Sequence, residues 1–102
     1  MMEEYILITG ASSGIGEATA IELSEEHRII LSGRNIEKLK EVQNKCHCPQ
    51  KHLLWRCDLD KDRLQVYTSL NSLLTEQEIS VKAFVHCAGM TKILPIKNFQ
   101  SQ

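Results

Sequence analysis

The sequence predicts an α/β protein built on a parallel sheet, with its elements in the order β-α-β-α-β-α-β. Two observations carry this prediction. Four short apolar runs typical of strands recur along the chain, and stretches whose apolar residues repeat every three or four positions lie between them. Strands that alternate with helices are joined by crossover connections, and such connections make the paired strands parallel.

Length and composition limit the class of protein. The chain has 102 residues, enough for one small domain, so we predict a single domain over residues 1–102. A hydrophobic content of 42% and a charged content of 25% are ordinary for a globular protein and argue against disorder. The net charge of −1 favours neither nucleic acid nor an anionic membrane as a partner. No apolar run approaches the roughly 18 residues of a membrane span. The N-terminus is acidic, whereas a secretory leader begins basic and has a longer apolar stretch, so we expect a cytoplasmic protein.

The first predicted strand and helix enclose a glycine-rich turn. Residues 5–8 form an apolar run typical of a strand that is buried on both faces. Residues 9–16 follow as the turn. The helix after it is expected to pack through three residues at helical spacing: Ile15, Thr19 and Leu23. We expect Ser24 to point away from this face. Residues 29–31 predict the second strand.

The second helix has the clearest start signal in the chain. Asn35 is a favourable N-cap residue, because its side chain accepts hydrogen bonds from the first turn. One face of this helix carries four residues that we expect to be buried: Ile36, Leu39, Val42 and Cys46. Pro49 ends the helix. Residues 53–57 then predict the third strand.

The last predicted helix and strand complete the alternation. The helix spans about residues 60–75, and its apolar stripe consists of Val66, Tyr67, Leu70, Leu73 and Leu74. Residues 81–86 predict the fourth strand. Residues 90–102, which contain a proline, are expected to form a loop and the start of a further helix.

The cysteines raise the alternative of a zinc site. Cys46, His47 and Cys48 are consecutive, with His52 and Cys57 downstream. Structural zinc sites pair cysteines with two to four residues between them and repeat the pair. Here one residue separates the first pair and no second pair follows it. We therefore expect buried free thiols and no metal site.

The glycine turn has the composition of a phosphate-binding site. Residues 9–16 read Thr-Gly-Ala-Ser-Ser-Gly-Ile-Gly. The start of a helix binds phosphate through backbone N–H groups when no side chain obstructs them. Gly10 would permit the tight turn, Gly14 the approach of a pyrophosphate, and Gly16 close packing against the sheet. Two hydroxyl donors lie between them: Ser12 and Ser13. The alternative is a glycine turn with a purely structural role.

This turn resembles the glycine motif of the short-chain dehydrogenase/reductase family. Arg34, Asp58-Leu59 and Ala88-Gly89 match that family in order, after the second, third and fourth strands. The resemblance covers essentially the whole chain but half or less of a typical member. It implies a three-layer, doubly wound Rossmann-type sheet of order 3-2-1-4, truncated after the fourth strand. It also implies cofactor contacts from Gly10, Ser12, Ser13, Gly14, Ile15, Gly16, Arg34, Asp58, Leu59, Ala88 and Gly89.

The residues after the second strand predict NADP as the cofactor. An NAD site has an acidic residue there, which accepts a hydrogen bond from the ribose 2′-OH. Ser32, Gly33 and Arg34 include no acid. A 2′-phosphate carries close to two negative charges, and arginine can bind it with two parallel hydrogen bonds. The alternative is that Arg34 is a solvated charge beside the second helix.

Two further positions keep more than one interpretation. Asp58 meets the adenine amino group according to the resemblance, and it could equally act as an N-cap. His86 and Cys87 stand where the family usually has two asparagines. In the family, these amides make a polar link to the central sheet, and the replacement puts that link in doubt here. We expect His86 to be a histidine at the end of a strand. Cys87 has no neighbouring base in the sequence that would make it a nucleophile.

The family's proton donor has no match in the sequence. Reduction of a carbonyl needs a proton donor beside the oxygen, and the resemblance implies a Tyr-x-x-x-Lys pair for this role. Tyr5 and Tyr67 are followed at that spacing by Thr9 and Asn71, so we assign no catalytic residue.

Two functions stay open. The chain is the N-terminal, NADP(H)-binding part of a reductase that transfers hydride between NADPH and a carbonyl or alcohol substrate, or it is a non-catalytic module that binds or senses NADP. In either case, we expect the fourth strand to present an open edge and the chain to form homo-oligomers.

Overall fold

The computed structural model describes residues 3–12, 14–57, 63–87 and 92–95. In this part of the chain, strands and helices alternate as predicted up to the fourth strand. The elements are β1 (Glu3–Thr9), α1 (Gly14–Leu23), β2 (Arg28–Gly33), α2 (Ile36–Lys45), the short 3-10 helix η1 (Pro49–Lys51), β3 (Leu53–Arg56), α3 (Arg63–Gln77), β4 (Ile79–His86) and β5 (Lys92–Pro95).

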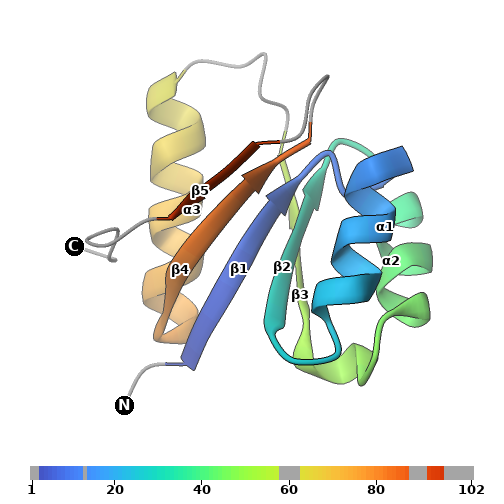
Figure 1. The fold of residues 1–102 in the computed structure, drawn as a ribbon. Helices are drawn as coiled ribbons and strands as arrows, with labels where there is room; N and C mark the ends of the chain where they lie inside the picture. Colours follow the sequence, from blue (N-terminus) through green and yellow to red (C-terminus); the bar gives the residue numbers. More distant parts are fainter. Residues whose placement is uncertain (1–2, 13, 58–62, 88–91, 96–102) are drawn as a thin grey trace.

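The sheet has the predicted topology over its first four strands. The strand order is β3-β2-β1-β4-β5, and β1 to β4 pair in parallel. Figure 1 shows α1 and α2 on one face of this sheet and α3 on the other. The three layers confirm the doubly wound fold of order 3-2-1-4.

The fifth strand corrects two expectations. We expected residues 90–102 to form a loop, which would leave β4 as the open edge of a sheet truncated there. Instead, β5 pairs antiparallel with β4, from Ala83 opposite Pro95 to His86 opposite Lys92. A proline is tolerated at the end of an edge strand, where its missing N–H breaks no ladder. The open β4 edge from which we expected homo-oligomers is therefore occupied over residues 83–86.

Alternation along the strands divides the core into two clusters, one on each face of the sheet. The cluster under α1 and α2 includes Ile6, Ile8, Ala20, Ile29, Leu31, Leu39 and Val42. The cluster under α3 includes Tyr5, Leu7, Ile30, Trp55, Leu70, Leu74 and Val81. Neighbouring residues of the inner strands enter different clusters, which explains why these strands are apolar throughout.

Helix α2 follows its sequence signals closely. Asn35 Oδ1 accepts hydrogen bonds from the backbone N–H groups of Glu37 and Lys38, at 3.1 and 3.3 Å, so the predicted N-cap is confirmed. Of the predicted face, Ile36 is half-buried and the other three residues are buried: Leu39, Val42 and Cys46. Cys46 is thus a thiol of the core, as expected.

Two predicted apolar positions are wrong. On α3, Leu70 and Leu74 are buried, but Tyr67 is 51% exposed because it lies at the margin of the buried stripe. On α1, Ile15 is 62% exposed, whereas its neighbour Gly16 is buried. Helix α1 lies close to the turn that follows β1. Gly16 occupies the position that faces this turn, and the larger side chain of Ile15 points outward.

Ser24 is also placed differently from our expectation. It lies directly after α1 and is buried. Its hydroxyl donates to the Ile21 carbonyl at 2.6 Å and accepts the His47 N–H at 2.8 Å. A small hydroxyl side chain satisfies backbone groups at a helix end, and here it joins the end of α1 to the segment after α2.

Candidate functional site

The carboxyl ends of β1 to β4 meet at one edge of the sheet (Figure 1). In open α/β sheets this is the edge at which ligands bind. Three backbone hydrogen bonds join its segments, each connecting one strand end to the next. They run from Ala11 N–H to Ser32 O at 3.0 Å, from Cys57 N–H to Gly33 O at 2.8 Å, and from Cys87 N–H to Thr9 O at 3.2 Å.

Gly16 is required by packing. An added Cβ there would lie 1.9 Å from the carbonyl oxygen of Gly10 and 2.7 Å from its carbon. Both are backbone atoms, so the clash cannot be relieved by turning a side chain. The prediction that only a hydrogen fits at Gly16 is confirmed, although the atoms in contact belong to the turn itself and not to the sheet.

Gly10 and Gly14 are required by backbone conformation. Their φ angles are +64° and +58°, in the left-handed region that side chains other than glycine rarely adopt. At Gly14, an added Cβ would meet no atom of the described residues within 4 Å. Apart from its chain neighbours, no described residue therefore crowds the Cα of Gly14 at the start of α1, and a phosphate group needs such an approach to the helix start.

Two other predicted residues flank the turn. Ser12 is half-buried, and its Oγ would lie 3.5 Å from a Cβ added at Gly33, so it lies between the turn and the end of β2. Ile15 presents its exposed side chain on the first turn of α1. An exposed apolar side chain next to an unobstructed helix start provides a surface that an apolar part of a ligand could cover.

Arg34 follows β2 directly and is exposed. Its carbonyl oxygen accepts a hydrogen bond from Nε of Arg56, at 3.2 Å. Arg56 ends β3 and is paired in register with Gly33. Our sequence interpretation missed Arg56, because nothing in a linear motif connects residues that lie 22 positions apart.

His86, which we expected at the end of a strand, makes a link across the sheet. It is the last residue of β4, as expected, and its Nδ1 lies 2.7 Å from Oγ1 of Thr9. Thr9 is the last residue of β1 and is buried. The hydrogen bond holds the start of the glycine turn against β4. Sequence reasoning placed Thr9 in the glycine turn but did not predict this hydrogen bond, because its two partners lie 77 residues apart.

Five predicted contact residues lie outside the described residues: Ser13, Asp58, Leu59, Ala88 and Gly89. The described part of the predicted site thus consists of the turn, the start of α1 and the arginine after β2. These segments are brought together at one edge of the sheet.

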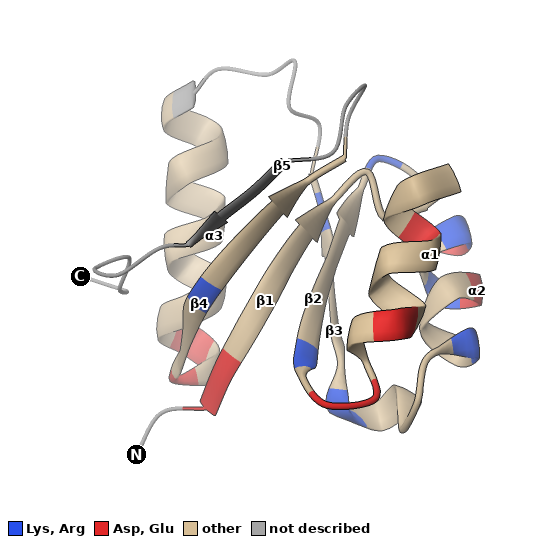
Figure 2. Ribbon diagram, in the orientation of Figure 1, with Lys and Arg blue, Asp and Glu red and all other residues tan. Residues whose placement is uncertain are grey.

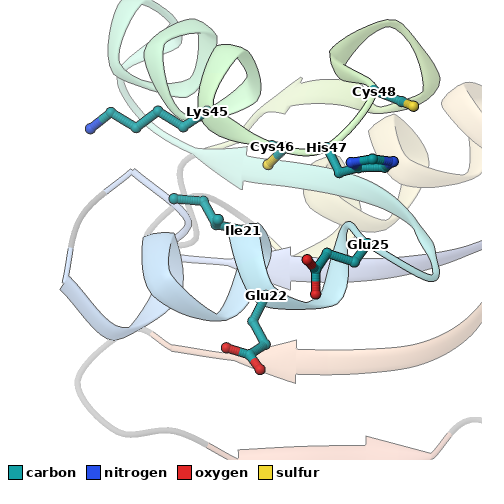
Figure 3. A pocket seen from close by; sticks show the side chains of 7 residues that line it. All are labelled: Ile21, Glu22, Glu25, Lys45, Cys46, His47 and Cys48. Carbon is teal, nitrogen blue, oxygen red and sulfur yellow. The ribbon is translucent and has the colours of Figure 1, made fainter.

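A hollow lies at the other end of the molecule, between the ends of α1 and α2. Its volume is about 520 Å³, and it is lined by Ile21, Glu22, Glu25, Lys45, Cys46, His47 and Cys48 (Figure 3). Burial raises the pKa of the Cys46 thiol, which favours the neutral form over the thiolate that binds metals and attacks electrophiles. Among the described residues, no group of three or more His, Cys, Asp or Glu side chains could hold a metal ion.

No helix in the described ranges has the length and apolar character needed to cross a membrane.

Comparison with known proteins gives a consistent family. The sequence profile of the family described as short chain dehydrogenase matches residues 4–102. An uncharacterized oxidoreductase of Schizosaccharomyces pombe is 37% identical over 88 residues, which are 82% of this chain and 25% of that protein. An uncharacterized oxidoreductase of Listeria innocua is 58% identical over 40 residues, which are 38% of this chain and 16% of that protein.

Solved structures share the fold. A protein of Shigella flexneri assigned to the short chain dehydrogenases has a TM-score of 0.74 at 27% identity, covering 87% of this chain and 41% of its own. The oxidoreductase yciK of E. coli has a TM-score of 0.71 at 26% identity, over 88% of this chain and 38% of its own. A metagenomic short-chain oxidoreductase in complex with NADP has a TM-score of 0.61 at 26% identity, over 76% of this chain and 35% of its own.

The chain is much shorter than these proteins. The matched segments cover 16% and 25% of the two curated relatives, and 35% to 41% of the three solved chains.

Proposed function

The chain belongs to the short chain dehydrogenase family, and we propose that residues 1–102 form one domain that binds NADP(H) for an oxidoreductase. The observation that carries this proposal is the turn between β1 and α1. Gly10 and Gly14 have left-handed φ angles, no described residue other than its chain neighbours crowds Gly14, and Gly16 lets the helix pack directly on the turn. A pyrophosphate fits such a surface, because backbone N–H groups and the helix dipole both attract it.

The remaining contacts of the proposal follow the shape of a dinucleotide. The helix start at Gly14 binds the pyrophosphate, and Ser12 donates a hydroxyl beside it. The exposed side chain of Ile15 covers an apolar part of the cofactor. We assign Asp58-Leu59 to the adenine and Ala88-Gly89 to a close backbone approach. These four residues are proposed from the family pattern alone, and Ser13 is added to the turn on the same ground.

The choice of NADP over NAD is supported by Arg34. This residue is exposed at the end of β2, next to the turn, and no acid precedes it in Ser32-Gly33. A guanidinium group there attracts a 2′-phosphate, whereas a 2′-hydroxyl has no charge for it to bind. The NADP-bound relative from a metagenome has the same fold at 26% identity, which is in keeping with this choice.

In the whole protein, bound NADPH would supply a hydride to a carbonyl carbon, and NADP would accept one from an alcohol. We propose that the whole protein is a cytoplasmic oxidoreductase of this kind. The part played by the residues described above is to bind and orient the cofactor. None of them is placed as the proton donor, since neither tyrosine of the sequence is followed by the lysine of the family's pair.

The proposal is tested by titrating the chain with NADPH and with NADH in a calorimeter. We expect NADPH to bind at least about tenfold more tightly, the value of one charge-assisted hydrogen bond. Arg34→Ala should reduce this preference, whereas Lys51→Ala, which deletes a charge in η1 before β3 begins, should keep it. Equal affinities of the unmodified chain for the two cofactors would exclude NADP as the preferred one.

The alternative is a module that binds NADP(H) without catalysis. The two proposals differ in what the gene encodes after codon 102. An in-frame Tyr-x-x-x-Lys downstream supports the oxidoreductase, and a stop codon directly after Gln102 supports the module.

A further inference from the structure

Two arginines from different strands meet at the proposed ribose end of the site. Arg34 follows β2, and Arg56 ends β3, the neighbouring strand. The Nε–H of Arg56 donates to the backbone carbonyl of Arg34 at 3.2 Å, which fixes the Arg56 guanidinium beside that residue. Figure 2 shows basic positions in the loop after β2 and at the end of β3, on the same edge of the sheet.

The parallel pairing explains why these residues meet. Gly33 and Arg56 are partners in the β2–β3 register, and neighbouring strands lie about 4.8 Å apart. Because Gly33 has no side chain, the long side chain of Arg56 can reach past it to the carbonyl of the next residue. The Cys57 N–H also donates to Gly33 O at 2.8 Å. The ends of β2 and β3 are therefore joined by this backbone bond as well as by the bond from Arg56 to Arg34 O.

The Arg56 guanidinium is suited to bind an anion at this place. A guanidinium group carries five N–H donors, and the bond to Arg34 uses one of them. Both arginines are exposed at the edge where ligands of open α/β sheets bind. Two positive charges held at one edge also raise the local potential and attract an anion that carries two negative charges.

We propose that Arg56 is a second determinant of cofactor specificity, which binds the 2′-phosphate of NADP(H) together with Arg34. This inference rests on the proposed function, because it concerns the same site. A 2′-phosphate is close to a dianion at neutral pH, so one arginine neutralises about half of its charge and a second completes the match. NADH, which has a hydroxyl at this position, gains nothing from Arg56.

The test separates the charge of Arg56 from its hydrogen bond to Arg34. Arg56→Gln keeps a side-chain amide that can donate to the Arg34 carbonyl but removes the charge, and Arg56→Lys keeps the charge. Lys51→Gln is the matched control, since it removes an exposed charge before β3 begins. Each variant is titrated with NADPH and NADH at two salt concentrations, after circular dichroism has shown that it is folded.

We expect Arg56→Gln to weaken NADPH binding about tenfold and to change NADH binding by less than about twofold. Arg56→Lys should fall between the unmodified chain and Arg56→Gln, and the control should match the unmodified chain. NADPH binding by Arg56→Gln should also depend less on salt.

Three results would overturn the inference. An unchanged NADPH preference in Arg56→Gln, with the preference lost in Arg34→Ala, rejects the role of Arg56 and leaves the proposed function standing. An equal loss for both cofactors means that Arg56 only supports the fold. If the unmodified chain does not prefer NADPH, the choice of cofactor fails as well.

Discussion

The two ends of the sheet use their polar groups in different ways. At the amino ends of β2 and β3, the buried side chain of His52 is bonded on both sides. Its Nδ1 accepts the Ile29 N–H at 3.0 Å, and its Nε2–H donates to the His47 carbonyl at 2.7 Å. The Gln43 amide nearby donates to the carbonyls of Pro49 and His52, at 3.1 and 2.9 Å. These groups serve the fold.

At the carboxyl ends of the same strands, polar groups face outward. Arg34 and Arg56 are both exposed, and the start of α1 at Gly14 has open space beside it. The comparison separates groups that serve the fold from groups that we propose for the binding of a cofactor. Hydrogen bonds join the segments at both ends, but the buried polar side chain of His52 lies at the amino ends, and two exposed arginines lie at the carboxyl ends.

Gly16→Ala should have the largest effect on stability. It tests whether the carboxyl end of the sheet, where we propose that the cofactor binds, also contains a residue that the fold requires. The new Cβ would lie 1.9 Å from the Gly10 carbonyl oxygen, so the turn or α1 must move. We expect a loss of about 3 kcal/mol in the free energy of unfolding, or failure to fold. Urea denaturation measures this. Gly14→Ala is the control, because its Cβ meets open space and it should cost only about 1 kcal/mol for the left-handed φ. Similar losses in both variants would contradict the packing argument.

His52→Ala should have the next largest effect on stability. It removes the buried histidine at the amino ends of β2 and β3. It leaves the buried Ile29 N–H without its acceptor and removes the bond to the His47 carbonyl. We expect a loss of about 2 kcal/mol in the free energy of unfolding and no change in the ratio of NADPH to NADH affinity. In the control His47→Ala, the backbone groups that make these bonds remain, so stability should change by less than about 0.5 kcal/mol. A changed cofactor preference in His52→Ala would mean that the two ends are coupled.

Acid should lower the free energy of unfolding through His52, by less than His52→Ala does. Burial lowers the pKa of His52, and its hydrogen bond to the His47 carbonyl opposes this only in part. The unfolded chain, in which the pKa is about 6.5, therefore binds the proton first as pH falls. The contribution of His52 is complete above about pH 6.5 and is lost progressively below it, because a proton on Nδ1 breaks the Ile29 bond.

Urea denaturation at about pH 7.5 and about pH 5.5 measures this loss. His52→Gln has no group that titrates in this range, so its stability should depend less on pH. The prediction fails if both proteins lose the same free energy of unfolding between the two conditions.

Local patterns predicted much of the fold. The Asn35 cap and the buried face of α2 depend on residues close together in sequence, and both are confirmed. The order of the first four strands, which the family resemblance implied, is confirmed as well. The wrong predictions concern residues whose placement depends on contact with another segment of the chain. Ile15 is turned outward because Gly16 packs on the β1 turn, and β5 forms because β4 offers it a partner.

The sequence by itself determined the class of fold, the family and the glycine turn, because these depend on periodicity and on spacing along the chain. Only the tertiary structure showed that Arg56 reaches Arg34 and that Thr9 bonds to His86, across 22 and 77 residues. Such contacts arise when strands pair in a particular register. A register is a property of two segments together, so neither segment alone contains it.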